Sequence, residues 1–260
     1  MNIIKNPVAI FEQGSPDKKS IVFVHGFPYD HTMWDDVISG LSADFHCVSY
    51  DVRGLGISDP GDGQYTIELF TDDLFYVIDK LNLKKTVICG LSMGGYICAR
   101  AVEREEEKLG GIILCDTKAA ADTDEVKIKR AAHVKKINEE GMKKFAAGFV
   151  PPCFAREFIN APGDGYSEIL ERAMNSNPTG VKGCLIAMAA RTDVTGYLPQ
   201  IKIPAMVLCG EKDTMSTPEA MQELAGKISG SKYYTVPGAG HMSPVENPEF
   251  VTERIREFLK

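Results

Sequence analysis

Short, almost continuously apolar runs alternate with longer amphipathic segments along this chain. Runs of this kind predict parallel β-strands, because a strand covered by helices on both faces needs apolar side chains on both sides. The predicted strands cover residues 21–24, 47–50, 86–89, 111–115, 205–209 and 233–236. Residues 7–13, before a Gly-Ser-Pro-Asp turn, are expected to add an antiparallel edge strand. The pattern therefore predicts an α/β fold with a mostly parallel sheet.

Two amphipathic segments carry clear helix signals. Residues 66–81 repeat apolar side chains at helical spacing. Near the C-terminus, Asn247, Pro248 and Glu249 supply a cap, a first-turn proline and an acid for a last helix. Such helices are expected to cross over between the parallel strands and to cover the sheet.

One stretch breaks the alternation of strands and helices. Between residues 118 and 195 no strand-like run occurs, and helical segments are expected around residues 125–139, 142–149, 166–174 and 181–190. The stretch lies between two core strands, so it should emerge at the carboxyl edge of the sheet, where open α/β folds bind ligands. We therefore expect an α/β core of residues 1–117 and 196–260, with a helical cap, or lid, of residues 118–195 inserted between core strands.

Composition and charge limit the classes of partner that the protein can bind. The 260 residues suit one α/β domain, and the formal net charge of -7 argues against a nucleic-acid partner. Basic residues between 127 and 136 alternate with apolar ones and indicate a solvated helix face. The seven cysteines show no paired spacing, which favours buried, reduced thiols. With neither a signal peptide nor a run long enough to span a bilayer, we expect a soluble, cytoplasmic protein without membrane contact.

The clearest candidate chemistry lies at Ser92. Residues 90–95 read Gly-Leu-Ser-Met-Gly-Gly, directly after a predicted strand and before the helical run 96–103. A serine in a sharp strand-to-helix turn needs neighbours without side chains, and the turn directs a helix N-terminus at whatever the serine attacks. The bare Gly-x-Ser-x-Gly pattern is weak, and a packing turn is its alternative, but this context predicts that Ser92 is a nucleophile.

A serine hydroxyl needs a base to take its proton. The chain offers His25, His31, His46, His133 and His241. Only His241 follows both Ser92 and the last predicted strand, and it lies in a glycine-rich loop that can fold back towards the nucleophile. We therefore predict that His241 is the general base.

The acid that orients the histidine should lie at another strand end. Asp213 fits best, because it follows the strand at 205–209 and precedes a helix start at Ser216. Asp116, at the end of the preceding core strand, is the rival, and a simple loop turn is the alternative role for Asp213.

An oxyanion hole requires converging backbone N–H groups. The residue after the nucleophile, Met93, and Phe27, in the loop after an earlier strand, occupy the expected positions. Gly26 and Pro28 shape that loop, and His25 is interpreted as a structural hydrogen-bonding residue beneath it.

Several of these segments occur together in the order and spacing of a known superfamily. They are residues 25–28 (His-Gly-Phe-Pro), Trp34, residues 51–58, residues 90–95, residues 210–213 (Gly-Glu-Lys-Asp) and Gly240-His241. The chain thereby resembles the α/β-hydrolase superfamily along nearly its whole length. Residues 91–96, 114–117 and 188–193 resemble bacterial carboxylesterases grouped with the 3-oxoadipate enol-lactonases.

The resemblance implies an eight-stranded sheet with helices on both faces and a helical cap. It implies a serine esterase, here a carboxylesterase, that cleaves short-chain esters through an acyl-enzyme on Ser92 without cofactor or metal. Its partner would be a small-molecule ester or lactone. The related dehalogenases carry an aspartate where Ser92 stands, which disfavours dehalogenation.

Alternatives remain open at this point. An enol-lactonase would need a cation for the substrate carboxylate, and Arg191 is the basic residue to examine, with a surface salt bridge as its alternative role. A slow-turnover small-ligand receptor of the same fold, carbon-carbon bond hydrolysis and perhydrolysis share the same triad. Monomer and homo-oligomer are both compatible with the sequence. Candidates for an apolar acyl pocket are Phe145, Phe149, Phe154, Met174, Leu185 and Met188.

Overall fold

An eight-stranded sheet forms the centre of the molecule, in the order β1-β2-β4-β3-β5-β6-β7-β8. The computed structural model describes residues 4, 5, 7–163 and 165–260. The strands are β1 (Ile4–Lys5), β2 (Ala9–Gln13), β3 (Ser20–Val24), β4 (His46–Tyr50), β5 (Thr86–Leu91), β6 (Leu109–Cys115), β7 (Ala205–Gly210) and β8 (Lys232–Val236). Strand β2 pairs antiparallel with both β1 and β4, and all other neighbouring strands pair parallel, which confirms the predicted fold class.

Alternate side chains of each central strand enter two separate hydrophobic cores, one on each face of the sheet. The long helices of the α/β part are α1 (Asp35–Leu41), α2 (Ile67–Lys80), α3 (Met93–Glu105), α8 (Pro218–Gly226) and α10 (Pro248–Leu259). On β3, Val22 belongs to the core beneath α2 and α3, and Phe23 belongs to the core beneath α1 and α10. Burial of both faces is the physical reason why the strands are visible as apolar runs.

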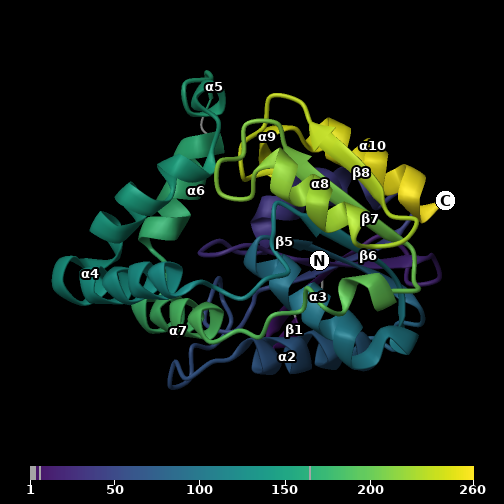
Figure 1. Cartoon of the computed structure of the whole chain (residues 1–260), viewed down its shortest axis with the longest axis horizontal. Coiled ribbons are helices and arrows are strands. Elements are labelled where there is room, and N and C mark those ends of the chain that lie inside the picture. Colours follow the sequence, from purple (N-terminus) through teal and green to yellow (C-terminus); the bar gives the residue numbers. More distant parts are fainter. Residues whose placement is uncertain (1–3, 6, 164) are drawn as a thin grey trace.

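Helices alone connect β6 to β7. They are α4 (Asp124–Phe149), α5 (Arg156–Ile159), α6 (Gly165–Met174) and α7 (Pro178–Ala189), and Figure 1 shows them gathered on one side of the molecule. Two predicted helices, 125–139 and 142–149, form the halves of α4, and the break between them lies at Gly141, which has φ 82°. The short helix α5 lacks a periodic apolar pattern, and the sequence analysis did not predict it.

The parallel strands end at a common edge, and the loops after them carry the predicted site residues. The loop after β3 carries Phe27, Ser92 follows β5, Asp213 follows β7, and His241 follows β8. Short elements complete this layout: the 3-10 helices His31–Trp34, Glu106–Lys108, Pro151–Cys153 and Leu198–Gln200, and helix α9 (Ser243–Glu246) after the His241 loop.

Two further expectations concern the chain as a whole. All seven cysteines are buried and none is in a disulfide bond, as predicted. Within the described residues, every helix is too short or too polar to cross a membrane.

Candidate active site

Ser92 occupies the turn between β5 and α3 in a strained backbone conformation, with φ 53° and ψ -111°. The turn is possible because glycines flank it: a Cβ on Gly94 would lie 2.2 Å from the carbonyl oxygen of Val24, and one on Gly90 would lie 2.3 Å from the carbonyl oxygen of Gly94. A left-handed conformation in a residue other than glycine is costly and marks functional sites. The Ser92 side chain is therefore lifted out of the turn, half-buried at the carboxyl edge of the sheet.

Asp213 and His241 meet directly. The Nδ1 of His241 lies 2.8 Å from Oδ2 of Asp213. The other oxygen of this carboxylate accepts hydrogen bonds from the backbone N–H groups of Met215 (2.7 Å) and Ser216 (3.0 Å), which fix its orientation. Because a carboxylate only accepts, Nδ1 carries the proton and Nε2 is the acceptor.

The second ring nitrogen of His241, Nε2, indicates which chemistry this residue can perform. Among the described residues, Nε2 is buried and has no hydrogen-bond partner, so Ser92 and His241 are not hydrogen-bonded in this structure. Contacts of this kind commonly tighten only when substrate binds. A buried imidazole whose one nitrogen is held by a carboxylate and whose other nitrogen is unpaired has the properties of a general base.

Asp116, the rival acid, has other partners. Its Oδ1 accepts from the backbone N–H of Gly210 (2.7 Å), and its Oδ2 accepts from the hydroxyl of Ser243. Burial, followed by the nearby charge of Asp213, raises the pKa of Asp116 well above its ordinary value. The geometry thus favours Asp213 over Asp116 as the partner of the histidine.

The loop after β3 lies beside the nucleophile turn. A Cβ on Gly26 would lie 3.6 Å from the Cβ of Ser92. His25 is fully buried: its Nε2 accepts from the backbone N–H of Val52 (2.8 Å), and its Nδ1 donates to the carbonyl of Gly26 (2.9 Å). Burial lowers the pKa of His25, in keeping with the predicted structural role. The peptide bond Phe27-Pro28 is cis.

The two predicted oxyanion donors, Phe27 and Met93, are both buried at this edge. The ring of Phe27 packs against Phe149 (centroids 5.3 Å apart) and Phe145 (6.2 Å) of α4. His133 packs against the same two rings, at 5.7 and 5.4 Å. Two of the candidate acyl-pocket residues therefore lie against the predicted oxyanion loop, and the donor roles of Phe27 and Met93 stay predictions.

Arg191 lies neither at a surface salt bridge nor free to meet a substrate. Its guanidinium bonds to Asp122, donates to the carbonyl oxygens of Met188 (3.0 Å) and Ala120 (2.7 Å), and covers the ring of Tyr96 at 4.1 Å. The side chains of the ion pair are 3% and 5% exposed. The surface salt bridge expected as its alternative role is wrong, because the pair is buried where the β6–β7 helices join the core.

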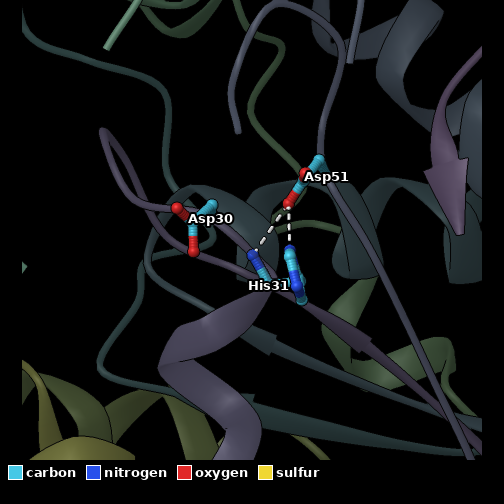
Figure 2. A group of neighbouring side chains, drawn as sticks. All are labelled: Asp30, His31 and Asp51. Carbon is cyan, nitrogen blue, oxygen red and sulfur yellow. Dashed lines mark hydrogen bonds and ion pairs between the residues drawn. The ribbon is translucent and has the colours of Figure 1, made fainter. Parts of the chain in front are cut away.

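Among the described residues, two clusters contain side chains that could ligate a metal, and each includes ligand atoms that are already hydrogen-bonded. One consists of Asp116, Cys209 and Asp213. Figure 2 shows the other, Asp30, His31 and Asp51, in which the backbone N–H and Nδ1 of His31 both bond to Oδ1 of Asp51 (2.9 and 2.7 Å). The second cluster ties the loop after β4 to the loop after β3.

Sequence reasoning missed Thr117. Its hydroxyl donates to the carbonyl of Ser92 (2.7 Å), and the backbone N–H of Ser92 donates to the carbonyl of Cys115 (2.9 Å). These contacts attach the nucleophile turn to the end of β6. A polar pair directly after a predicted strand, here Asp116 and Thr117, was the available signal.

Comparison with known proteins agrees with this geometry. Residues 21–254 match the alpha/beta hydrolase family. The chain belongs to this family. The match confirms the superfamily resemblance, and the role of Ser92 as nucleophile stays a prediction.

The individual relatives of this alpha/beta hydrolase include esterases and lactonases. A thermophilic esterase from Thermogutta terrifontis superposes with a TM-score of 0.92 and is 34% identical, covering 99% of this chain and 96% of its own. The enol-lactonase from Burkholderia xenovorans LB400 reaches a TM-score of 0.90 at 29% identity, covering 98% and 97%. A curated relative, 3-oxoadipate enol-lactonase 2 of Acinetobacter baylyi, is 25% identical over 95% of this chain and 91% of its own length. These relatives support a hydrolase activity.

Proposed function

We propose that this protein is a carboxylesterase that hydrolyses short-chain carboxylic esters through an acyl-enzyme on Ser92. The observation that carries the proposal is the strained conformation of Ser92, φ 53°, in a turn that the loop of Gly26 closely approaches. Strain at a serine has a use when the hydroxyl must stand clear of the backbone to attack a bound acyl group.

The reaction follows from the roles of three side chains. Ser92 Oγ attacks the acyl carbon while Nε2 of His241 takes the hydroxyl proton, and Asp213 stabilises the imidazolium. The backbone N–H groups of Phe27 and Met93 hold the oxyanion. The tetrahedral intermediate collapses with loss of the alcohol, which leaves with the proton from His241, and a water molecule activated by His241 then cleaves the acyl-enzyme.

The surroundings favour an uncharged acyl group. The helices of residues 118–195 act as a cap in this proposal, and Phe145 and Phe149 form its apolar wall beside Phe27. Arg191, the cation that a carboxylate-bearing lactone would need, is already paired with Asp122 inside the protein. An unpaired negative charge would be costly to bury against the aromatic wall.

A lactonase activity is the second candidate. The similarity to enol-lactonases from two bacteria favours it. A lactonase that acts on a carboxylate-bearing lactone would need a cation other than Arg191 to bind the substrate carboxylate. An uncharged lactone needs no such cation, so a lactonase activity of this protein would favour an uncharged lactone as substrate.

The test compares p-nitrophenyl butyrate hydrolysis by the wild-type protein, Ser92→Ala and the matched control Ser15→Ala. Loss of one member of a triad that acts as a unit should lower kcat by several orders of magnitude, roughly 10⁴-fold or more. Ser15 lies in a turn between β2 and β3 and its variant should retain full activity. Equal rates in the wild type and Ser92→Ala, or no turnover in either, would contradict the proposal and favour a ligand receptor.

A further inference from the structure

Glu246 holds the backbone on both sides of the proposed base. It is the last residue of α9 and lies five positions after His241. Its Oε1 accepts hydrogen bonds from the backbone N–H groups of Gly240 (2.9 Å) and Met242 (3.1 Å), the two neighbours of His241 in the chain. A single carboxylate oxygen thereby fixes the peptide groups that determine where the imidazole stands.

The second oxygen of Glu246 bonds to the cap. Its Oε2 accepts from the backbone N–H of Ala155 (2.8 Å), the residue before α5. Gly240 is pressed against the same segment, because a Cβ there would lie 2.6 Å from the nitrogen of Ala155 and 2.9 Å from the carbonyl carbon of Phe154. The loop of the base and the cap are therefore joined through one side chain.

We propose that Glu246 is a positioning residue that aligns His241 only while residues 154–155 of the cap are seated on the base loop. The inference rests on the proposed function. Charge-assisted bonds from a carboxylate to backbone N–H groups are about twice as strong as neutral ones, so Glu246 is suited to holding a loop against the cap.

The electrostatic surroundings of Glu246 agree with a link to His241. Burial raises the pKa of Glu246, whereas the three amide donors and His241 favour its ionised form. The other titratable groups that interact with it are Tyr29 of the loop after β3, Cys153 of the cap and Asp116 at the end of β6. None of these three is cationic, so His241 is the group in this set that can carry a positive charge beside Glu246.

The experiment measures the rate at which a fluorophosphonate probe labels Ser92, as a function of pH, in the wild type, Glu246→Gln and Glu211→Gln. Glutamine keeps one acceptor oxygen and loses the charge, so it cannot bond to both the base loop and the cap. Glu211 is the matched control, an exposed carboxylate that accepts from Gly238 of the same loop (2.8 Å). All assays are made well below the melting temperature of each variant.

We expect Glu246→Gln to label up to about 100-fold more slowly, because a displacement of about 1 Å at the base can cost that much. The acidic limb of its pH–rate profile should move to lower pH, because the carboxylate no longer favours protonation of His241. Glu211→Gln should behave as the wild type. A wild-type labelling rate in Glu246→Gln, or a slower rate with an unchanged pH profile, would overturn the proposal.

Two further outcomes are distinguished: failure of the proposed function, and failure of Glu246→Gln to fold. If the wild-type protein is not labelled, or Ser92→Ala is labelled equally, the proposed function fails and this inference falls with it. If Glu246→Gln does not fold, Glu246→Asp decides: it keeps the charge but shortens the reach, so slow labelling with a wild-type pH profile is expected, and fast labelling would overturn the proposal.

Discussion

At the scale of single residues, two buried carboxyl groups share the end of the sheet but have different partners. Asp213 bonds to His241 and to two backbone N–H groups. Asp116 bonds to Gly210 and Ser243, and its raised pKa reflects burial together with the charge of Asp213. Burial and a like charge nearby both disfavour the ionised form of a carboxyl group, which is the physical cause of the raised pKa of Asp116.

Asp116→Asn, which replaces the carboxyl by a neutral group of the same shape, is therefore expected to stabilise the protein at neutral pH. The ordinary pKa of 3.8 is raised in the folded state, so the folded protein retains a proton that the unfolded chain releases above about pH 4. This difference in proton binding lowers the free energy of unfolding of the wild type more and more as the pH rises. The variant has no carboxyl group at this position and does not lose stability in this way. Urea unfolding of both proteins between pH 4 and pH 8 measures the effect.

The variant should gain relative stability as the pH rises. The control is Asp36→Asn, on the exposed side of α1. A stability difference for Asp116→Asn that falls with increasing pH would show that folding lowers the pKa of Asp116, and would contradict this account.

At the scale of elements, close backbone contacts attach the helices of residues 118–195 to the core. Helix α7 lies directly on the loop after β4: a Cβ on Gly180 would lie 1.8 Å from the carbonyl oxygen of Gly54. A Cβ on Gly183, one turn further on, would lie 2.5 Å from the carbonyl oxygen of Gly63. Glycines at these two positions let the helix and the loop approach more closely than side chains would allow.

Gly180→Ala is expected to destabilise the protein by about 1–3 kcal/mol, because the added methyl group has no space and the helix or the loop must move. Gly226→Ala is the matched control in α8, where a Cβ would meet nothing within 4 Å. There the better helix propensity of alanine should stabilise the protein by up to about 1 kcal/mol. Chemical denaturation measures both, and equal effects of the two substitutions would contradict this account of the α7 contact.

The parts of the structure that could be predicted from the sequence are those marked by a local pattern of residues. The parallel strands were predicted to within a few residues, since burial of both faces leaves an apolar run, and Ser92, Asp213 and His241 stood in recognisable contexts. The pairing of Arg191 with Asp122 could not be predicted, because it joins residues 69 positions apart. The same holds for the contacts of Glu246 across 91 positions to Ala155.

At the scale of the whole molecule, a buried ion pair joins the two ends of the helical segment between β6 and β7. Asp122 stands just before α4, and Arg191 stands just after α7 and lies over Tyr96 of α3. Arg130 bonds to the same carboxylate from within α4. The entry and exit of the β6–β7 helices are thus held together and against the core.

Arg191→Met should destabilise the protein by about 1–3 kcal/mol, because the buried carbonyl groups of Met188 and Ala120 lose their donor while Arg130 still pairs with Asp122. Lys227→Met is the control, since Lys227 pairs with Glu223 on the surface (2.9 Å) and such pairs contribute about 1 kcal/mol or less. Thermal and urea unfolding measure the difference. Retention of full stability together with a selective rise in KM for carboxylate-bearing lactones would instead assign Arg191 to substrate binding.

The most direct test of the central claim is mass spectrometry of the protein after acid quenching during turnover of p-nitrophenyl butyrate. The proposed mechanism predicts one butyryl group on the wild-type protein, on the peptide that contains Ser92, and none on Ser92→Ala. Turnover without a covalent adduct, or an adduct on another residue, would contradict an acyl-enzyme on Ser92.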